Sequence, residues 1–488
     1  MSDSPHNVLL PSLPSAVPLP GAVLFGFDNY AFPFQNHVQV HLIPGDKPQI
    51  ALPLGGPGST DEVILHYGTV LRIGGRYHMW YAGNHAHPDQ PGKRRTRICY
   101  ATSDDAIHWD KPELGLVEFH GNTRNNLVDL PIDSALQPSA IVLHDPDDPD
   151  PSRRFKLAFE AMDTDAGFNR FNVAFSEDGL TWKPSPANPV GPWFEMSGIA
   201  KFRGLYYVSG QAEATAHRPV PVRRLCTFVS ADFEHWSPIS AVGLDRSSDV
   251  RGPSTAANRN ADEEIHLGSS LWDRGNVLLA VYGQWHGHPS GDRRNLTMDL
   301  GLTLSYDALH HIEPIPDFPF IPAREQPGSP RGSAPALMQG QGFVSTDDRT
   351  LYWYSSWRGG DSSGVLVASW ERDRLGMLKP YEPDAAQAIS CPVEITSGEA
   401  PVHVNASGLG AHTQIRISLL DEGFRPIPGY SGEDAAIVDT SGYQVPVRWR
   451  GNTTIPASLG RVRFDISFTG IRPEDARLHA LYVGENFG

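Results

Sequence analysis

A short motif recurs along this chain, in which a serine is followed by an aspartate two residues later and by a tryptophan four residues after that. The complete copies are Ser103–Trp109, Ser176–Trp182 and Ser230–Trp236. A fourth copy, Ser305–His311, has histidine at the tryptophan position, and a fifth, Ser369–Asp373, is recognised mainly by its place in the chain. Each copy follows an apolar or β-branched segment, and successive serines are 73, 54, 75 and 64 residues apart. Repeats at this spacing are typical of four-stranded sheets arranged in a ring, so the motif predicts a five-bladed β-propeller.

The motif itself has the chemistry of a tight turn. A short polar side chain followed by aspartate can accept hydrogen bonds from the backbone of the next residues, and a tryptophan can then cover the following hairpin strand. We therefore expect these serines, aspartates and tryptophans to support the scaffold and not to contact a substrate.

Charge and composition exclude several classes of partner. The 488 residues include 40 lysines and arginines against 56 aspartates and glutamates, a formal net charge of −16. Nucleic acid requires a basic surface, so no nucleic-acid partner is expected. The three cysteines provide no disulfide framework. The first residues lack a basic segment followed by an apolar run, and no stretch has the length of a membrane span. We expect a cytoplasmic protein without a membrane partner, and its oligomeric state is left open.

Changes in pattern divide the chain into three regions. Residues 1–60 are proline-rich and predict a lead-in that wraps the propeller and can supply a strand that closes the ring. Residues 61–385 contain the repeats and are expected to form the propeller, which is the catalytic domain. Residues 386–488 contain short strands with alternating apolar residues, such as Gln414–Leu420 and Arg461–Phe468, and predict an antiparallel β-sandwich. The expected fold class is all-β, a five-bladed β-propeller followed by a C-terminal β-sandwich.

The innermost strands of a propeller converge on an axial pocket, so side chains at the starts of these strands and after the second strands should meet at one mouth. Carboxylates, arginine, histidine and tryptophan occupy these positions and together suit a carbohydrate, because the indole stacks on the sugar ring and the charged groups bind hydroxyls. The candidate substrate-binding residues are Asp61, Glu62, His66, Asp133, Gln137, Arg251, His286, Arg331 and Trp357.

Hydrolysis of a glycosidic bond requires two carboxyl groups, one as acid and one as nucleophile or base. Glu195 is the first candidate for the general acid, because it follows two aromatic residues at the start of an expected central strand. Asp249 is the candidate nucleophile or base, and Glu160, at the end of an apolar strand, can replace either. The alternative for each is an ordinary hydrogen-bonding or turn-closing carboxylate. No metal and no cofactor is expected, since no His-Glu-x-x-His or paired-cysteine spacing occurs.

Three groups of residues resemble a known superfamily, the five-bladed β-propeller glycosidases of families 32, 43 and 68, and in particular an uncharacterised bacterial branch similar to family 32. They are Ser103–Trp109 with Lys111–Val117, Asp299–His311 with Pro319–Pro322, and Ile427–Ser431 with Pro446–Arg450. The resemblance implies the fold above and carboxylate-based glycoside hydrolysis. The family motif Trp-Met-Asn-Asp-Pro-Asn-Gly has no counterpart here. Asp249–Pro253 is a loose and inverted form of the Arg-Asp-Pro motif, and Glu195-Met196 approximates the Glu-Cys motif.

Three functions follow from these observations. The first is a glycosidase acting on a furanoside, such as a fructoside or an arabinoside. The second is a glycoside phosphorylase, in which Arg251, Arg331 and a histidine would hold phosphate. The third is a sugar-binding propeller without catalysis. A six-bladed sialidase is disfavoured, because the units number five and the motif is one residue shorter than the sialidase motif.

Overall fold

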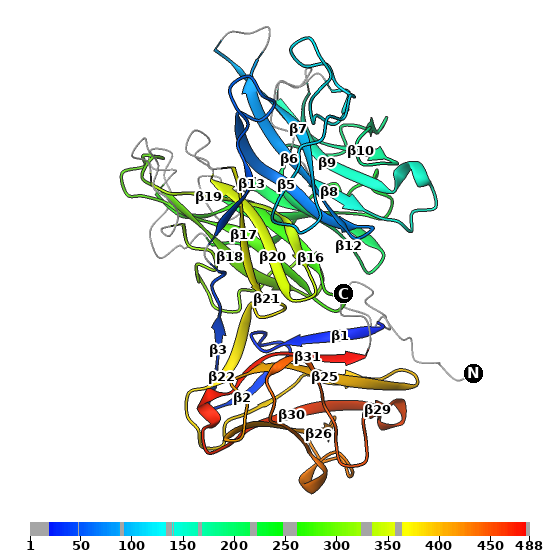
Figure 1. The fold of residues 1–488 in the computed structure, drawn as a ribbon, viewed down its shortest axis with the longest axis vertical. Helices are drawn as coiled ribbons and strands as arrows, with labels where there is room; N and C mark the ends of the chain where they lie inside the picture. The colour runs from blue at the N-terminus through cyan, green and yellow to red at the C-terminus, as the bar shows by residue number, and fades with distance from the viewer. Residues whose placement is uncertain are drawn as a thin grey trace, which may run out of the picture.

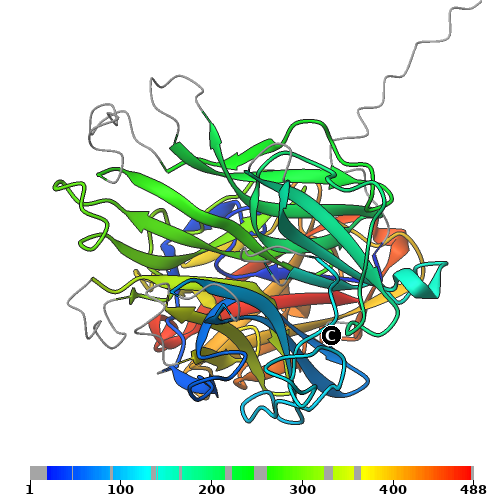
Figure 2. The ribbon, with the colours of Figure 1, turned by 90° about the horizontal axis from the view of Figure 1, so that it is seen from above.

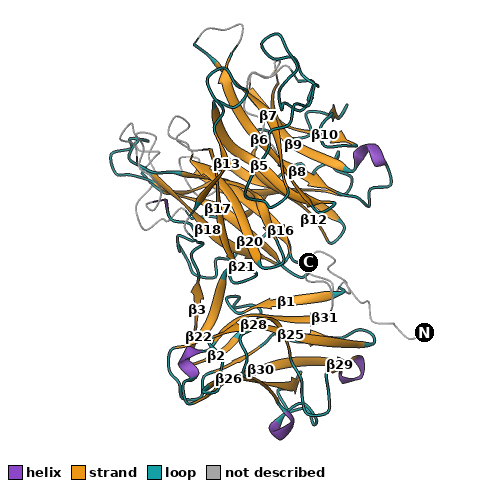
Figure 3. Ribbon diagram, viewed as in Figure 1, coloured by secondary structure: helices purple, strands orange, loops and turns teal. Residues whose placement is uncertain are grey.

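The computed structural model describes residues 19–46, 48–87, 92–132, 139, 141–163, 168–214, 222–246, 261–323, 334–356 and 364–484 (Figure 1). Regular structure in these segments consists of strands and short 3-10 turns such as Pro151–Arg153, as the colours of Figure 3 show. The prediction of an all-β chain is therefore confirmed. No helix in these segments has the length and apolar character needed to cross a membrane.

The larger part of the molecule, at the top of Figure 1, consists of antiparallel sheets built from consecutive strands. One contains β8 (Ile141–His144), β9 (Phe155–Asp163), β10 (Phe168–Ser176) and β11 (Lys183–Pro184). The next contains β12 (Glu195–Phe202), β13 (Leu205–Ala214), β14 (Val222–Ser230) and β15 (Ala241–Leu244). A third contains β16 (Glu263–Asp273), β17 (Leu278–His286) and β18 (Thr297–Ser305).

A seven-stranded sheet unites the start and the end of this part. Its order is β4-β21-β20-β19-β5-β6-β7. Its strands are β4 (Gln49–Pro53), β5 (Val63–Ile73), β6 (Arg76–Ala86), β7 (Arg94–Ser103), β19 (Leu337–Ser345), β20 (Arg349–Ser356) and β21 (Gly364–Glu371). Its two antiparallel halves meet at β19 and β5, which run parallel and share a single backbone pair, Gln341 with Thr69. Figure 2 shows these sheets from above, over the orange and red C-terminal strands.

Side chains on β19 and β5, the first strands of the two halves of the seven-stranded sheet, connect it to neighbouring sheets. The Gln341 amide on β19 donates to the carbonyls of Ile199 on β12 and Leu271 on β16, at 2.6 and 3.2 Å, and accepts from their backbone N–H groups. Thr69 on β5 accepts from the Val142 N–H on β8 at 2.9 Å. Because Gln341 and Thr69 are themselves buried, these bonds satisfy polar groups that water cannot reach.

Most first strands of the upper sheets contain a β-bulge that begins within the first half of the strand. The register shifts between Leu65 and Thr69, Met196 and Gly198, His266 and Ser269, and Gln339 and Phe343. In β16 the bulge places Gly268 at φ 73°, where an added Cβ would lie 2.3 Å from the Gly210 carbonyl oxygen of β13. A bulge bends its strand and re-aims the side chains beside it, so these irregularities set the directions of residues at the starts of the strands.

The repeated motif forms the same turn at its first four positions. Ser103 Oγ accepts from the Ala106 N–H at 2.9 Å, and Asp105 Oδ1 accepts from the N–H groups of the next two residues at 2.9 and 2.8 Å. The aspartates of the copies at 176, 230 and 305 accept the equivalent pair of bonds. The residue after each aspartate has a positive φ, at Ala106, Gly179, Phe233 and Ala308. The expected turn-closing role of the aspartates is thus seen directly.

Two further sheets form the lower part of Figure 1. The first has the order β28-β25-β31-β22-β3, with β1 on β31 and β29 on β25. Its strands are β1 (Gly21–Phe25), β3 (Val38–Leu42), β22 (Gly376–Pro380), β25 (Glu399–Ser407), β28 (Gly442–Pro446), β29 (Thr454–Pro456) and β31 (Arg477–Gly484). The second has the order β2-β23-β30-β26-β27, with β24 on β30. Its strands are β2 (Phe34–Asn36), β23 (Gln387–Ile389), β24 (Val393–Glu394), β26 (Thr413–Asp421), β27 (Ala436–Val438) and β30 (Arg461–Gly470).

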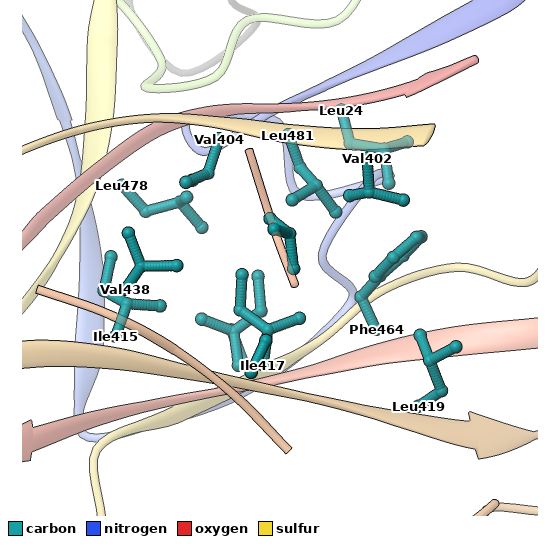
Figure 4. Packing of buried hydrophobic residues seen from close by; sticks show 14 of the residues in the cluster. Leu24, Val402, Val404, Ile415, Ile417, Leu419, Val438, Phe464, Leu478 and Leu481 are labelled. Atoms are coloured by element: carbon teal, nitrogen blue, oxygen red, sulfur yellow. The ribbon is translucent and has the colours of Figure 1, made fainter. Parts of the chain in front are cut away.

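Apolar side chains fill the space between these two sheets. Val402 and Leu481 of the first sheet point towards Ile417 and Phe464 of the second, and all four are buried (Figure 4). The N-terminal segment contributes β1, β2 and β3 to this part of the molecule, whereas β4 lies on the outer edge of β21. Strand β22 also belongs here, so sequence before residue 386 takes part in these sheets.

A buried ion pair lies at the junction of the upper and lower parts. Arg274, after β16, binds Asp373, after β21, through two bonds of 2.7 and 2.9 Å. The Tyr482 hydroxyl of β31 donates to the same carboxylate at 2.8 Å. The Arg274 guanidinium also lies 4.4 Å from the centre of the Trp272 ring. This cluster lies where β31 of the lower part contacts the turns of the upper part.

Candidate functional site

Two glutamates lie close together at the ends of neighbouring central sheets. Glu160 is near the end of β9 and is only 6% exposed, and its Oε2 accepts from the Asn169 amide at 3.3 Å. Burial, and then the negative charge of Glu195, raise the pKa of Glu160 well above its ordinary value. A raised pKa lets a carboxyl group hold its proton to a higher pH, which is what a general acid requires.

Glu195, the first residue of β12, has a fixed partner. It pairs across the sheet with Gln211 of β13, whose amide nitrogen donates to Glu195 Oε2. The oxygen of the same amide accepts from the Leu267 N–H of the β16 bulge at 2.8 Å. Since that backbone group can only donate, it fixes the amide orientation and directs the NH₂ group of Gln211 to the carboxylate. The β16 bulge therefore positions Glu195 through Gln211.

A second cluster of charged and polar residues surrounds Trp285 at the end of β17. The Arg223 and Arg293 guanidinium carbons lie 4.6 and 5.5 Å from the centre of the Trp285 ring. Glu264, 3% exposed, has its Oε2 3.9 Å from Arg223 Nε. Burial, together with the charges of Arg223 and Arg293, lowers the pKa of the nearby His266 well below its ordinary value. A neutral imidazole, an indole and two cations are suited to binding an oxygen-rich or anionic ligand.

Glu264 and His266 are absent from the candidates of the sequence analysis, which includes Arg251 for the mouth of the pocket instead. The first strand of this sheet begins at Glu263, twelve residues after Arg251. The pattern Glu263-Glu-Ile-His-Leu267 carries the signal that could have shown it, since apolar and polar residues alternate there as they do in a strand. The preceding segment contains glycine, proline and asparagine and has no such alternation.

His286, a predicted substrate-binding residue, lies between two carboxylates. Its Nδ1 is 2.8 Å from Glu263 Oε2, and its Nε2 is 3.0 Å from Asp299 Oδ2. Burial opposes the charged imidazole, but the hydrogen bonds to Asp299 and Glu263 outweigh it and raise the pKa of His286 to about 9. Arg246 binds Glu263 at 3.2 Å on the other side. His286 is thus the charged centre of an ion-pair network.

Asp61 and Glu62 are also engaged within the protein. Asp61 is 2% exposed, and its Oδ2 accepts from the Tyr81 hydroxyl at 2.7 Å and from Lys111 Nζ at 2.6 Å. Glu62 accepts from the Gly58 N–H at 2.7 Å and from Arg94 at 3.2 Å. These contacts support the turn before β5.

Several predicted residues lie outside the described part of the chain. They are Asp133, Gln137, Asp249, Arg251, Arg331 and Trp357. His66 lies in β5, but its side chain is not described. The described residues contain no group of three histidine, cysteine, aspartate or glutamate side chains arranged to hold a metal ion.

No family model matches the chain. Two uncharacterised proteins of Mycobacterium tuberculosis, from strains CDC 1551 and H37Rv, are each 26% identical to it over 154 residues. The matched residues make up 31% of this chain and 45% of the length of either relative, so the chain spans less than half of the relatives that it matches.

Solved structures with a similar course of the chain come from carbohydrate-active enzymes. One is a GH130 structure, from a family of mannoside phosphorylases that contains glycoside hydrolases of β-1,2 mannosidic linkages (TM-score 0.46, 15% identity, 68% of this chain, 95% of that one). Another is a glycosyl hydrolase from Bacteroides ovatus (TM-score 0.44, 15% identity, 68% and 95%). A third is the Bombyx mori GH32 β-fructofuranosidase (TM-score 0.36, 14% identity, 91% and 93%). All three TM-scores are below 0.5, so the function of this chain has to be inferred from its own residues.

Proposed function

We propose that this chain is a glycosidase whose reaction takes place between Glu160 and Glu195. The observation that carries the proposal is the buried Glu160, whose pKa is raised by burial and by the charge of Glu195, beside a Glu195 that Gln211 holds in place. In this proposal the upper sheets, within residues 61–385, are the five blades of a propeller, and residues 386–488 with strands from the lead-in form a β-sandwich. The proposed substrate is a furanoside, such as a fructoside or an arabinoside. The proposed location is the cytoplasm.

The environments of the two glutamates suggest their roles. Glu160 donates its proton to the glycosidic oxygen as the bond from that oxygen to the anomeric carbon breaks. Glu195 accepts a hydrogen bond from Gln211, which favours its ionised form and suits the nucleophile or base. Water supplies the hydroxyl group of the released sugar, and its remaining proton restores Glu160 or passes to Glu195. This assignment places the acid on Glu160, whereas the sequence analysis places it on Glu195; Asp249 remains a candidate third carboxylate.

The cations around Trp285 favour one second candidate, a glycoside phosphorylase. Arg223 and Arg293 could hold phosphate near Trp285, as Arg251 and Arg331 were expected to do. Phosphate would then attack the anomeric carbon in place of water, and Glu160 would still supply the proton. Phosphate dependence separates the two reactions.

The test measures sugar release by the purified protein from aryl and natural furanosides and pyranosides, with and without phosphate. Glu160→Gln and Glu195→Gln are run beside Glu177→Gln, which neutralises an exposed glutamate of the repeated motif as a matched control. Phosphate-independent release that both site variants lose and the control retains supports the glycosidase. Release only with phosphate supports the phosphorylase. Release that is unchanged in both site variants would refute the assignment, and absence of release across the panel favours a non-catalytic sugar-binding propeller.

A further inference from the structure

Gln339 of β19 holds the bulge of β16 beside the candidate site. Its side chain is 1% exposed, and its amide nitrogen donates to the carbonyl oxygens of His266 and Gly268, at 2.7 and 3.0 Å. These carbonyl oxygens can only accept, so the NH₂ end of the amide must face the bulge. The amide oxygen of Gln339 has no hydrogen-bond partner within the described segments. The hydrogen bonding of this side chain there is therefore directed to the two carbonyls on either side of Leu267.

The unpaired amide oxygen distinguishes Gln339 from a neighbouring glutamine on the same strand. Burying an acceptor without a partner reduces stability, and an apolar side chain of similar size avoids this cost. Gln341, two residues later, uses both ends of its amide, because its oxygen accepts from the N–H groups of Ile199 and Leu271. Gln339 uses only the NH₂ end, which points to a role in orienting the bulge rather than in general packing.

The backbone that Gln339 contacts has an unfavourable conformation. Leu267 and Gly268 have positive φ angles of 61° and 73°. A left-handed conformation is disfavoured for leucine, because its Cβ comes close to the carbonyl oxygen, so the surrounding structure has to hold it. The Leu267 side chain forms a small buried cluster with Ala82 of β6 and Met338 of β19. Strand β19 therefore holds Leu267 through its side chain as well as through the carbonyls beside it.

One planar peptide group connects Gln339 to Gln211. The His266 carbonyl and the Leu267 N–H belong to the same peptide unit, and in a trans peptide these two groups point in opposite directions. The bond from Gln339 therefore fixes the direction of the N–H group, which donates to Gln211 Oε1 at 2.8 Å. The NH₂ group of Gln211 then donates to Glu195 Oε2. These three amide groups, called the amide series below, each donate towards the carboxylate.

The direction of the amide series favours the ionised form of Glu195. A hydrogen bond donated to a carboxylate stabilises its negative charge. Bonds in series inside a protein polarise one another, which strengthens the last donor. If the Leu267 peptide turned, the Gln211 amide would be free to reverse and to offer its oxygen to Glu195. An acceptor beside the carboxyl group would favour the protonated form.

We propose that Gln339 is a positioning residue for Glu195, and that it acts through the 266–267 peptide and Gln211 to keep this carboxylate ionised. This role rests on the proposed function, because there Glu195 is the nucleophile or base. It makes the chemistry at the start of β12 depend on β19, a strand of the seven-stranded sheet that unites the start and the end of the upper part.

The first experiment measures kcat/KM for sugar release against pH in Gln339→Met, Gln211→Met and the double variant. Methionine has a similar length and no hydrogen-bond donor. The acid limb of the profile reports the group that must be deprotonated. Loss of a hydrogen bond to a charged group should move this limb in Gln339→Met to higher pH by about one unit, a tenfold loss of kcat/KM on the limb. Gln211→Met should shift it at least as far, and the double variant no further than Gln211→Met.

Gln341→Met is the matched control for this experiment. It removes a buried glutamine from the same strand that also bonds to β12 and β16, but not to the 266–267 peptide. This variant should lose stability without a shift of the acid limb. An unmoved limb in Gln339→Met, an equal shift in Gln341→Met, or additive shifts in the double variant would overturn the proposal. If circular dichroism shows that Gln339→Met does not fold, Gln339→Asn takes its place, because its amide is one methylene further from the bulge.

A second measurement separates failure of this proposal from failure of the proposed function. The midpoints of urea unfolding at pH 7 of Gln339→Met, Glu195→Gln and their double variant require no substrate. The amide series stabilises a charged carboxylate, so Gln339→Met should lower the midpoint less in the Glu195→Gln background than in the unaltered chain. Where the protein releases sugar, the acid limb decides. Where it releases none, the glycosidase proposal fails by itself; non-additive midpoints then support the role of Gln339, and additive midpoints overturn it.

Discussion

The ionisation of Glu160 links the proposed reaction to stability. Its pKa is raised in the folded protein, so the folded state binds this proton more tightly than the unfolded chain does. The stability of the protein should therefore fall as the pH rises above about 4.5, by up to about 1.4 kcal/mol per pH unit until the folded pKa is reached.

Glu160→Gln should remove this slope while abolishing sugar release. The amide keeps the size of the side chain and cannot ionise, so the variant should be about as stable as the unaltered protein at pH 4 and more stable at pH 8. Thermal unfolding at several pH values measures the effect, with Glu177→Gln as the control. A variant with the same pH slope as the unaltered protein would contradict the assigned protonation state.

Lys156 is fully buried and compensated by neighbouring acids. Its Nζ donates to Asp148 at 2.6 Å and to the Arg153 carbonyl at 2.8 Å, and Asp145 lies 3.6 Å away. Burying a charge is tolerated only when partners of this kind surround it.

Lys156→Met should leave the carboxylate of Asp148 without its cation. Loss of one partner from a buried ion pair costs about 3–5 kcal/mol, so the midpoint of urea unfolding should fall sharply. Lys183→Met, at an exposed position on β11, is the control and should change little. Equal midpoints for the two variants would show that the buried network contributes nothing.

Among the elements, the bulge of β16 is the one that orients a residue of the candidate site, because its Leu267 N–H donates to Gln211. Gly268→Ala would place a methyl group against the Gly210 carbonyl and force alanine into a left-handed conformation. The conformational strain alone costs about 1–2 kcal/mol, and the steric conflict adds to it. Because the adjacent Leu267 N–H orients Gln211, sugar release should fall as well.

Gly204→Ala provides the matched comparison for this prediction. Gly204 also has a positive φ, of 83°, but an added Cβ there would meet nothing within 4 Å. It should lose only the conformational part of the stability, and its activity should be unchanged. Chemical unfolding and activity assays of both variants test the difference, and equal losses would disprove the role of the bulge.

The elements also show how far prediction from sequence reaches. The second and third strands of the upper sheets follow from apolar runs and from the repeated turn, as at Tyr77–Gly83 within β6. The starts of the first strands do not follow so simply, because bulges interrupt their period of two and long loops precede them.

The residues of the candidate site could be predicted from the sequence, but their roles could not. Glu160 and Glu195 stand next to apolar or aromatic residues at strand ends, and this placed them among the candidates. The roles proposed for them depend on Gln211 and on the backbone of Leu267, which comes from another sheet. Contacts between segments this distant in sequence leave no local pattern, so the assignment of acid and base required the structure.

At the scale of the whole molecule, the pair of Arg274 and Asp373 lies at the junction of the two parts, where the Tyr482 hydroxyl of β31 donates to Asp373. Asp373→Asn keeps the shape of the side chain but leaves the Arg274 guanidinium buried without its counter-charge, which costs about 3–5 kcal/mol. The unfolding midpoint should therefore drop. Arg461→Gln, which breaks an exposed pair with Glu394, should leave it unchanged. An unchanged midpoint for Asp373→Asn would show that the junction does not depend on this pair.

The pairing of β1 with β31 has a consequence for the order of events during synthesis. Gly21 lies opposite Gly484, so the first described strand completes its hydrogen bonds only with the last one. The ribosome releases the upper strands in sequence, and the sheets β8–β11, β12–β15 and β16–β18 can each close from consecutive strands. The segment that contains β1 must instead wait for its partner strand until β31 emerges. A chain that stops before β31 would keep its central sheets and still leave its own beginning unfinished.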